Sequence, residues 1–273
     1  MQLEDHLGDI IRKARKMSEI SAPAAASAAG ISESNLAALE STGNCPVKVN
    51  FAGLAKMIGL HPEKLQSIAN GWLPKAQTIS WWQELRVVSS SAEGLTVNAY
   101  LVWDPATCDA ALFDTGVEAV PVLACLGVDQ LRLTHIFITH SHWDHVEALG
   151  AIRAAFPDAA LHTGSKNAPA QQRNQPGEII RLGNLSIAHS ETPGHAEDGV
   201  TYLINGWRNA APPVAVVGDT IFAGSMGNGN EQWELARRKI RKEILSLPLE
   251  TLLCPGHGPL TTVGEEREHN PFF

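Results

Sequence analysis

The feature that most limits the fold is a run of metal-binding residue types directly after an apolar segment. Ile136 to Thr139 has the composition of a buried strand, and the next six residues are His140-Ser141-His142-Trp143-Asp144-His145. In an extended segment, His140 and His142 point to the same side with Cα atoms ~6.5 Å apart, so both imidazole rings can bind one cation. Structural histidines do not account for so regular a pattern. We therefore predict a metal centre at the end of this strand.

The same run predicts a second cation beside the first. Asp144 and His145 lie at the start of a predicted helix, where adjacent side chains diverge by roughly 100°. Two cations need further ligands, and residues that follow other predicted strands are candidates. Glycine beside such a residue lets the backbone approach a crowded site. Three residues meet both conditions: His195, Asp219 and His257.

Length and composition limit the kind of protein that can hold this metal centre. A chain of 273 residues, 44% of them apolar, holds one large domain or two unequal ones, and we favour two. The four cysteines are scattered without a C-x-x-C pair, which fits neither a disulfide framework nor a thiolate zinc site. The N-terminus lacks a secretory pattern, and no apolar run approaches the roughly 18 residues of a membrane span. We expect a cytoplasmic protein that does not enter a membrane.

The first 70 residues predict a small all-helical domain. Leu3, Leu7, Ile10 and Ala14 recur at helical spacing, and further short helices follow up to residue 69 without an intervening strand signal. Residues 71–85 have the composition of a linker, and residues 86–273 form the second domain. We expect Trp81 and Trp82 to pack one domain on the other, with an aromatic wall for a substrate as the alternative.

Part of this helical domain resembles the helix-turn-helix domain of the Cro/repressor type. Gly30 makes a tight turn between two short predicted helices, and Arg15 and Glu40 match a structural ion pair of that family. The third helix begins near Ser32 and offers Glu33 and other residues without a Lys or Arg to contact phosphate or guanine. The formal charge of −8 lies wholly beyond residue 70. Dimerisation through this domain, or a small regulatory role, is therefore favoured over DNA binding.

From residue 86 onward, short strands rich in aliphatic and β-branched residues alternate with helices. Such runs of strands with helices placed outside predict an α+β fold, a layered αββα sandwich. Helices are expected at Ala119–Leu126, Val146–Phe156 and Glu231–Ser246. Strands are expected at 86–89, 95–103, 110–113, 135–139, 160–162, 185–189, 200–204, 214–217 and 251–253.

The seven candidate ligands, in their order along the chain, resemble those of the metallo-β-lactamase superfamily. The resemblance implies that His140, His142 and His195 hold the first metal. It also implies that Asp144, His145 and His257 hold the second, with Asp219 bridging the two. Within the superfamily, the segments 218–222 and 255–259 and the tail 261–272 are most similar to the short glyoxalase II-like branch.

This ligand set implies hydrolysis of a thioester or a related ester or lactone. Two close divalent cations share a water, lower its pKa and hold it as hydroxide, which attacks a carbonyl polarised by one metal. Asp219 holds the cations together, and Asp144 also orients the water or receives a proton. Zinc is the preferred metal, with iron and manganese as alternatives, because nitrogen and oxygen ligands discriminate weakly among them.

Two departures from the branch leave glutathione open as part of the substrate. Glutathione-dependent members have a basic residue and an aromatic where this chain has Asn228-Gly229-Asn230, and glyoxalase II has a tyrosine at the position of Pro259. His135, His162 and His189 lie along predicted strands, and we expect them in the core or in support of the ligands.

Two other functions remain open at this point. The related persulfide dioxygenases bind one iron through residues that match His140, His195 and Asp219, a ligand set that suits oxygen chemistry. Hydrolysis is preferred because His257 completes a second site. The third reading is a DNA-binding regulator whose hydrolase-derived domain senses a ligand or metal.

Overall fold

The computed structural model describes residues 2–75 and 81–273, and its N-terminal part is a group of short helices. Ser21, Ser32 and Asn50 each accept a hydrogen bond from the backbone N–H three residues later, which fixes where three of these helices begin. Gly30 ends the second helix with φ +67°. The helices are α1 (Leu7–Met17), α2 (Ala22–Ala29), α3 (Glu33–Thr42), α4 (Phe51–Met57) and α5 (Pro62–Ala69).

The predicted ion pair between α1 and α3 is present. Arg15 Nε lies 2.6 Å from Glu40 Oε1, and Arg15 Nη2 lies 2.8 Å from Glu40 Oε2. Glu40 is only 8% exposed, so this bidentate contact joins the two helices inside the group. The contact agrees with the sequence-based expectation, while the helix-turn-helix assignment itself stays a prediction.

The remainder of the chain forms two facing sheets. The first has the order β1-β2-β3-β4-β5, in which β3, β4 and β5 run parallel to one another. The second has the order β13-β12-β9-β8-β7-β6, with β12 and β9 as its parallel pair. The strands of the first sheet are β1 (Leu85–Ala92), β2 (Leu95–Trp103), β3 (Asp109–Phe113), β4 (Arg132–Ile138) and β5 (Ala160–Thr163). Those of the second are β6 (Ile179–Leu182), β7 (Leu185–Glu191), β8 (Val200–Asn205), β9 (Val214–Gly218), β12 (Leu252–Pro255) and β13 (Thr261–Thr262).

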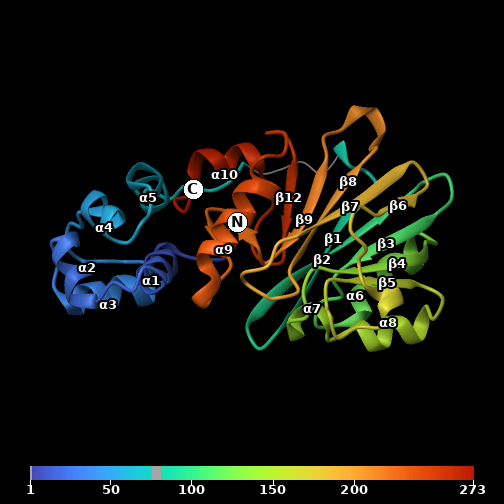
Figure 1. The fold of residues 1–273 in the computed structure, drawn as a ribbon, viewed down its shortest axis with the longest axis horizontal. Coiled ribbons are helices and arrows are strands. Elements are labelled where there is room, and N and C mark those ends of the chain that lie inside the picture. Colours follow the sequence, from blue (N-terminus) through green and yellow to red (C-terminus); the bar gives the residue numbers. More distant parts are fainter. Residues whose placement is uncertain (1, 76–80) are drawn as a thin grey trace.

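Helices cover the outer face of each sheet, which gives the αββα layering seen in Figure 1. Phe113 and Phe137 of the first sheet meet Tyr202 of the second in the central core, where all three are buried. The helices outside the first sheet are α6 (Ala119–Val128), α7 (Trp143–Val146) and α8 (Leu149–Ala155). Beside the second sheet lie the hairpin β10 (Ile221–Phe222) and β11 (Ser225–Met226), α9 (Trp233–Lys239), a π-helical turn (Ile240–Ile244) and α10 (Val263–His269).

The N-terminal helices share one hydrophobic core with the second sheet. Ile10 and Leu65 belong to the same buried cluster as Val217, Met226 and Ile240. In Figure 1 the blue helices extend from the side of the molecule that carries α9 and α10. The helical group therefore packs on the sandwich through a continuous apolar contact, rather than being joined to it by the linker alone.

The expectation for the tryptophan pair is wrong. Trp82 is 4% exposed inside the sandwich, where its indole Nε1 donates a hydrogen bond 2.8 Å long to Pro212 O, and Trp81 is 65% exposed. Trp82 lies three residues before the start of β1, and its side chain belongs to the buried cluster between the two sheets. An aromatic contact between the two parts is made by Trp72, whose ring stacks 4.8 Å from that of His269.

The predicted sandwich is confirmed, with differences at the ends of elements. The expected helix over 146–156 is observed as α8, which begins at Leu149 after the separate short helix α7. The expected helix over 231–246 changes to a π-helical turn at Ile240. The short strands β6, β10, β11 and β13 were missed. Residues 76–80 of the predicted linker lie outside the described residues. In the described part of the chain, no helix is both long and apolar enough to cross a membrane.

Candidate metal centre

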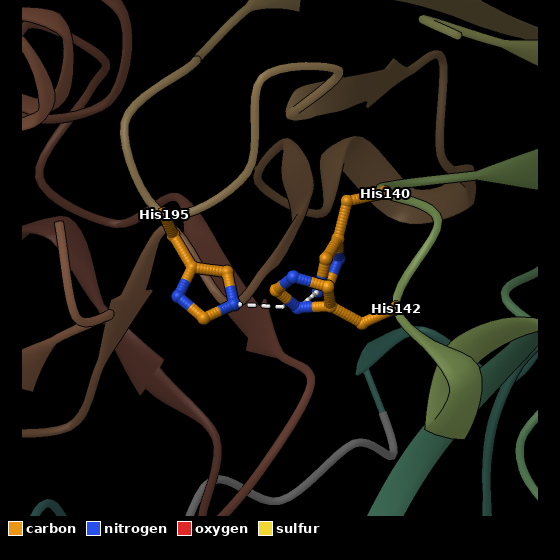
Figure 2. A group of neighbouring side chains, drawn as sticks. All are labelled: His140, His142 and His195. Carbon is orange, nitrogen blue, oxygen red and sulfur yellow. Dashed lines mark hydrogen bonds between the residues drawn. The ribbon is translucent and has the colours of Figure 1, made fainter. Parts of the chain in front are cut away.

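The first group of donor atoms consists of three imidazoles from two loops. His140 and His142 follow β4, and His195 follows β7. His142 Nδ1 lies 3.0 Å from His140 Nε2 and 3.0 Å from His195 Nε2, and Figure 2 shows the three rings converging. Ligand atoms held about 2.0 Å from a tetrahedral zinc lie ~3.3 Å apart, so this spacing suits three ligands of one cation.

The second group lies deeper and combines two imidazoles with a carboxylate. Asp144 and His145 belong to α7, and His257 follows β12. Asp144 Oδ2 lies 3.1 Å from His257 Nε2 and 3.6 Å from His145 Nε2. His145 is fully buried and His257 is 4% exposed. Donor atoms at these separations form a second set that faces a common point.

Asp219 lies between the two groups. Its Oδ2 is 3.5 Å from His195 Nε2 in the first group and 3.4 Å from His257 Nε2 in the second. Its Oδ1 is 3.3 Å from His145 Nε2. Asp219 directly follows β9, whose last residue Gly218 has φ +51° and turns the chain sharply at that point. One carboxylate is thereby within reach of two cation positions.

Residues behind the donor atoms fix the orientation of the imidazoles. Asp114 Oδ2 accepts a hydrogen bond 2.7 Å long from His145 Nδ1, and Asp114 Oδ1 accepts one from the Thr139 backbone N–H at 2.7 Å. His257 Nδ1 lies 2.7 Å from the backbone oxygen of Thr96. In each case Nδ1 is engaged and Nε2 points into the centre, the arrangement that supports imidazole ligands of metals.

The pKa values within the centre separate the imidazoles into two kinds. Burial, with the nearby charge of His145, holds the pKa of His140 well below its usual value. Burial also acts to lower the pKa of His145, but the charge of Asp114 outweighs it and raises that pKa to about 10. Hydrogen bonds to Asp144 and Asp219 likewise overcome burial and raise the pKa of His257 to about 11. The carboxylates of Asp114, Asp144 and Asp219 thus favour positive charge at the imidazoles of the second group.

Three buried side-chain atoms of the centre lack a hydrogen-bond partner. One is His195 Nδ1, and the other two are His145 Nε2 and Asp219 Oδ1, which face each other at 3.3 Å. Unsatisfied buried polar atoms are rare and costly, and a cation placed between the latter two would satisfy both. The centre is also too tight for a methyl group at Gly256, where a Cβ would lie 2.3 Å from Asp219 Oδ1. The donor set and the backbone around it therefore fit divalent cations.

A cavity of about 420 Å³ opens beside the first group. His142 and His195 line this cavity, as do Lys166 and Glu197, which form an exposed ion pair with Nζ 3.0 Å from Oε1. A cavity of this size, lined by two of the candidate ligands, suits a small-molecule substrate. Its other lining residues are Ser141, Gly164, Ser165, Asn167, Ala196 and Asp198.

Comparison with known proteins agrees with this geometry. The pattern of the metallo-beta-lactamase superfamily matches residues 92–257, more than half of the chain. The chain belongs to this superfamily. Hydroxyacylglutathione hydrolase GloC of Haemophilus influenzae is 28% identical over 201 residues, which cover 64% of this chain and 92% of that protein. A hydroxyacylglutathione hydrolase of Methylobacterium sp. is 36% identical over 160 residues, which cover 58% of this chain and 60% of that protein.

A solved structure shares the superfamily fold. ETHE1 from Myxococcus xanthus superposes with a TM-score of 0.59 at 30% identity, covering 68% of this chain and 83% of that chain. The superfamily fold implies a dimetal site, and this chain has clusters of His and Asp that could hold metal ions.

All seven residues selected from the sequence lie in this one centre, and their roles as individual ligands stay a prediction. His135 and His162 lie elsewhere, as expected, with His135 Nδ1 3.0 Å from His162 Nε2. Asp114 was missed, although it directly follows a predicted strand, as Asp219 does. That position after a strand is the signal that would have found it.

Proposed function

We propose that this superfamily hydrolase holds two divalent cations and cleaves a thioester or a related ester or lactone. The observation that carries the proposal is the position of Asp219, whose carboxylate faces both groups of donor atoms. His140, His142 and His195 would hold one cation, and Asp144, His145 and His257 the other. Nitrogen and carboxylate ligands favour zinc, with iron or manganese as alternatives.

The chain's own residues prepare this chemistry. When bound, the cations lower the pKa of a water toward neutrality and polarise the carbonyl under attack. Burial raises the pKa of Asp144, but the hydrogen bond with His257 and the charge of His145 outweigh it and lower that pKa overall. Asp144 is therefore ionised at neutral pH and is available to orient a water or to accept its proton.

The second candidate function is that of a single-iron dioxygenase. Such a site needs only three ligands, which here would be His140, His195 and Asp219. Those three donors are present, with Asp219 Oδ2 3.5 Å from His195 Nε2 and 4.0 Å from His140 Nε2. A single-iron site leaves no role for the contact of 3.1 Å between Asp144 and His257. This contact favours the two-metal hydrolase, as does His145 Nε2, which is buried without a hydrogen-bond partner.

We infer that residues 1–70 are a helix-turn-helix module with a structural or dimerising role. Their core continues into that of the second sheet, which suits a module fixed on the enzyme. Glu33 and Ser34 are exposed on α3 and carry no positive charge for DNA. A DNA-binding regulator is therefore the less favoured reading.

A panel of thioesters, lactones and phosphodiesters tests the proposal, with acylglutathione thioesters included beside simpler ones. We expect thioester or lactone hydrolysis that a chelator abolishes. His142→Ala should reduce it by at least roughly 100-fold, because the first group loses one of three imidazoles. The control is His189→Ala, a histidine on β7 outside the centre, which should retain activity. Full activity in His142→Ala would refute the proposed centre.

A further inference from the structure

The segment that precedes α1 lies against the loop that carries His257. Gly258 follows that histidine and has φ +72°. A Cβ at Gly258 would lie 3.0 Å from Glu4 N and 3.1 Å from Glu4 Cβ, so Glu4 is in contact with this loop. Residues from opposite ends of the chain thereby meet beside the second group of donor atoms.

An ionic contact fixes this segment in place. Asp5 Oδ2 lies 2.5 Å from Lys13 Nζ and also accepts a hydrogen bond from Ser225 Oγ. Lys13 Nζ donates a second hydrogen bond, 2.6 Å long, to Met226 O. The side chains of Lys13 and Asp5 are only 13% and 15% exposed, so the contact is shielded from solvent. It joins the helical module to the β10–β11 hairpin.

This hairpin leads directly to the metal centre. Lys13 Nζ lies 5.6 Å from the centre of the Phe222 ring, which in turn lies 6.0 Å from the His257 ring. The ammonium group of Lys13 forms an ion pair with Asp5 and donates a hydrogen bond to Met226 O. Its charge is paired with that of Asp5, and it also acts to lower the pKa of Glu4.

Glu4 itself is exposed, whereas Asp5 and Lys13, which hold the segment in place, are partly buried. Partial burial raises the pKa of its carboxyl. The contact of its backbone and Cβ with Gly258 places Glu4 beside the loop that carries His257. Lys166, which lines the cavity, is paired with Glu197.

We propose that Glu4 is a specificity-determining residue, which the helical module contributes to the metal centre. Its carboxylate disfavours ligands that carry a second negative charge near His257 and favours neutral or cationic ones. As it concerns the substrate class, this inference rests on the proposed function. The helical module then has a role in the reaction that does not require DNA.

The test uses small thiols, which bind divalent metals through sulfur without being hydrolysed. The probes are mercaptoacetate, 2-mercaptoethanol and cysteamine, which differ in charge at similar size. Their dissociation constants are measured calorimetrically with the metal-loaded protein at pH 8 and low salt. Glu4→Gln removes the charge and keeps the size. Glu33→Gln on α3 is the matched control, because it removes one exposed carboxylate from the same module.

We expect Glu4→Gln to favour mercaptoacetate over 2-mercaptoethanol by roughly tenfold and to disfavour cysteamine, with both changes shrinking at high salt. Glu33→Gln should leave the ratios within about twofold. Equal ratios in wild type and Glu4→Gln, or the same change in Glu33→Gln, would overturn the inference, as would wild-type protein that binds none of the thiols. If the ratios change as expected but no thioester or lactone is hydrolysed, the selection by Glu4 stands and the proposed hydrolysis fails.

Discussion

The carboxylate of Asp114 lies 2.7 Å from Nδ1 of His145, and both side chains are at most 1% exposed. Asp114 follows β3 and His145 lies in α7, so this contact ties the helix that carries two candidate ligands to the first sheet. The hydrogen bond occupies Nδ1 and leaves Nε2 directed at Asp219, 3.3 Å from its Oδ1. Asp114 therefore sets which nitrogen of His145 faces a metal.

Replacing Asp114 by asparagine should weaken metal binding without removing a ligand. We expect Asp114→Asn to lower the affinity of the second site by roughly 10- to 100-fold, the usual cost of losing such a supporting carboxylate. Competition with a chelator measures the affinity. Asp109→Asn, which removes a surface partner of Arg132, is the control and should change little. An Asp114→Asn protein that binds metal as tightly as wild type would exclude this role.

Gly256 should be intolerant of a side chain. A Cβ there would lie 2.3 Å from Asp219 Oδ1 and 2.5 Å from His145 Cε1, so Gly256→Ala must displace a donor atom. We expect metal content to fall and the free energy of unfolding of the metal-free protein to drop by about 1–3 kcal/mol. Gly127→Ala on α6, where a Cβ meets nothing within 4 Å, should change stability by less than about 1 kcal/mol. Equal metal content in both variants would contradict the prediction.

Glu266 should make stability depend on pH. It is fully buried on α10, and burial raises the pKa of its carboxyl to about 7 despite hydrogen bonds from Thr261 and Asn270. Between about pH 4.5 and 7 the unfolded chain loses this proton and the folded chain keeps it, so the free energy of unfolding falls as pH rises. The full loss is roughly 3 kcal/mol.

Urea unfolding at pH 4.5 and pH 7.5, at fixed metal content, measures this effect. Glu266→Gln has no proton to lose at this position. The decrease in the free energy of unfolding that Glu266 causes as pH rises should therefore be absent in this variant. The hydrogen bond from Gly224 N to Glu266 Oε2, 3.0 Å long, is also disturbed in this variant, so it should be less stable at pH 4.5. The same decrease between the two pH values in both proteins would show that Glu266 is not the titrating group.

The helical module should not bind DNA. The exposed residues at the start of α3 are Ser32, Glu33 and Ser34, none of which carries a positive charge, so this face supplies no cation to drive counterion release. A gel shift with DNA from upstream of the gene is expected to show no complex even at low salt. A complex whose affinity falls steeply with salt would instead support the regulator.

The seven residues that gather in the centre could be selected from the sequence because their pattern is local. His140 to His145 form a pattern that needs no tertiary information, and a strand before each of His195, Asp219 and His257 places them at one edge of the sheets. The ends of elements were predicted less well. β10 and β13 are two residues long, too short to show an alternating pattern, and their pairing depends on neighbours distant in sequence.

Contacts between the two parts of the molecule could not be predicted from local pattern. Glu4 meets Gly258, and Asp5 meets Ser225, across more than 200 residues of sequence. Trp82 was expected between the parts because it lies near the linker, yet it fills the sandwich, and Trp72 makes the aromatic contact instead. Such pairings follow from packing, which periodicity does not encode.

The number of metal ions per chain tests the account most directly. Elemental analysis of protein purified with zinc, iron and manganese all available should find two metal equivalents, because Asp219 faces two groups of donor atoms. His257→Ala should reduce the content to about one. A wild-type protein that retains a single equivalent, all of it iron, would contradict the two-metal hydrolase and support the dioxygenase.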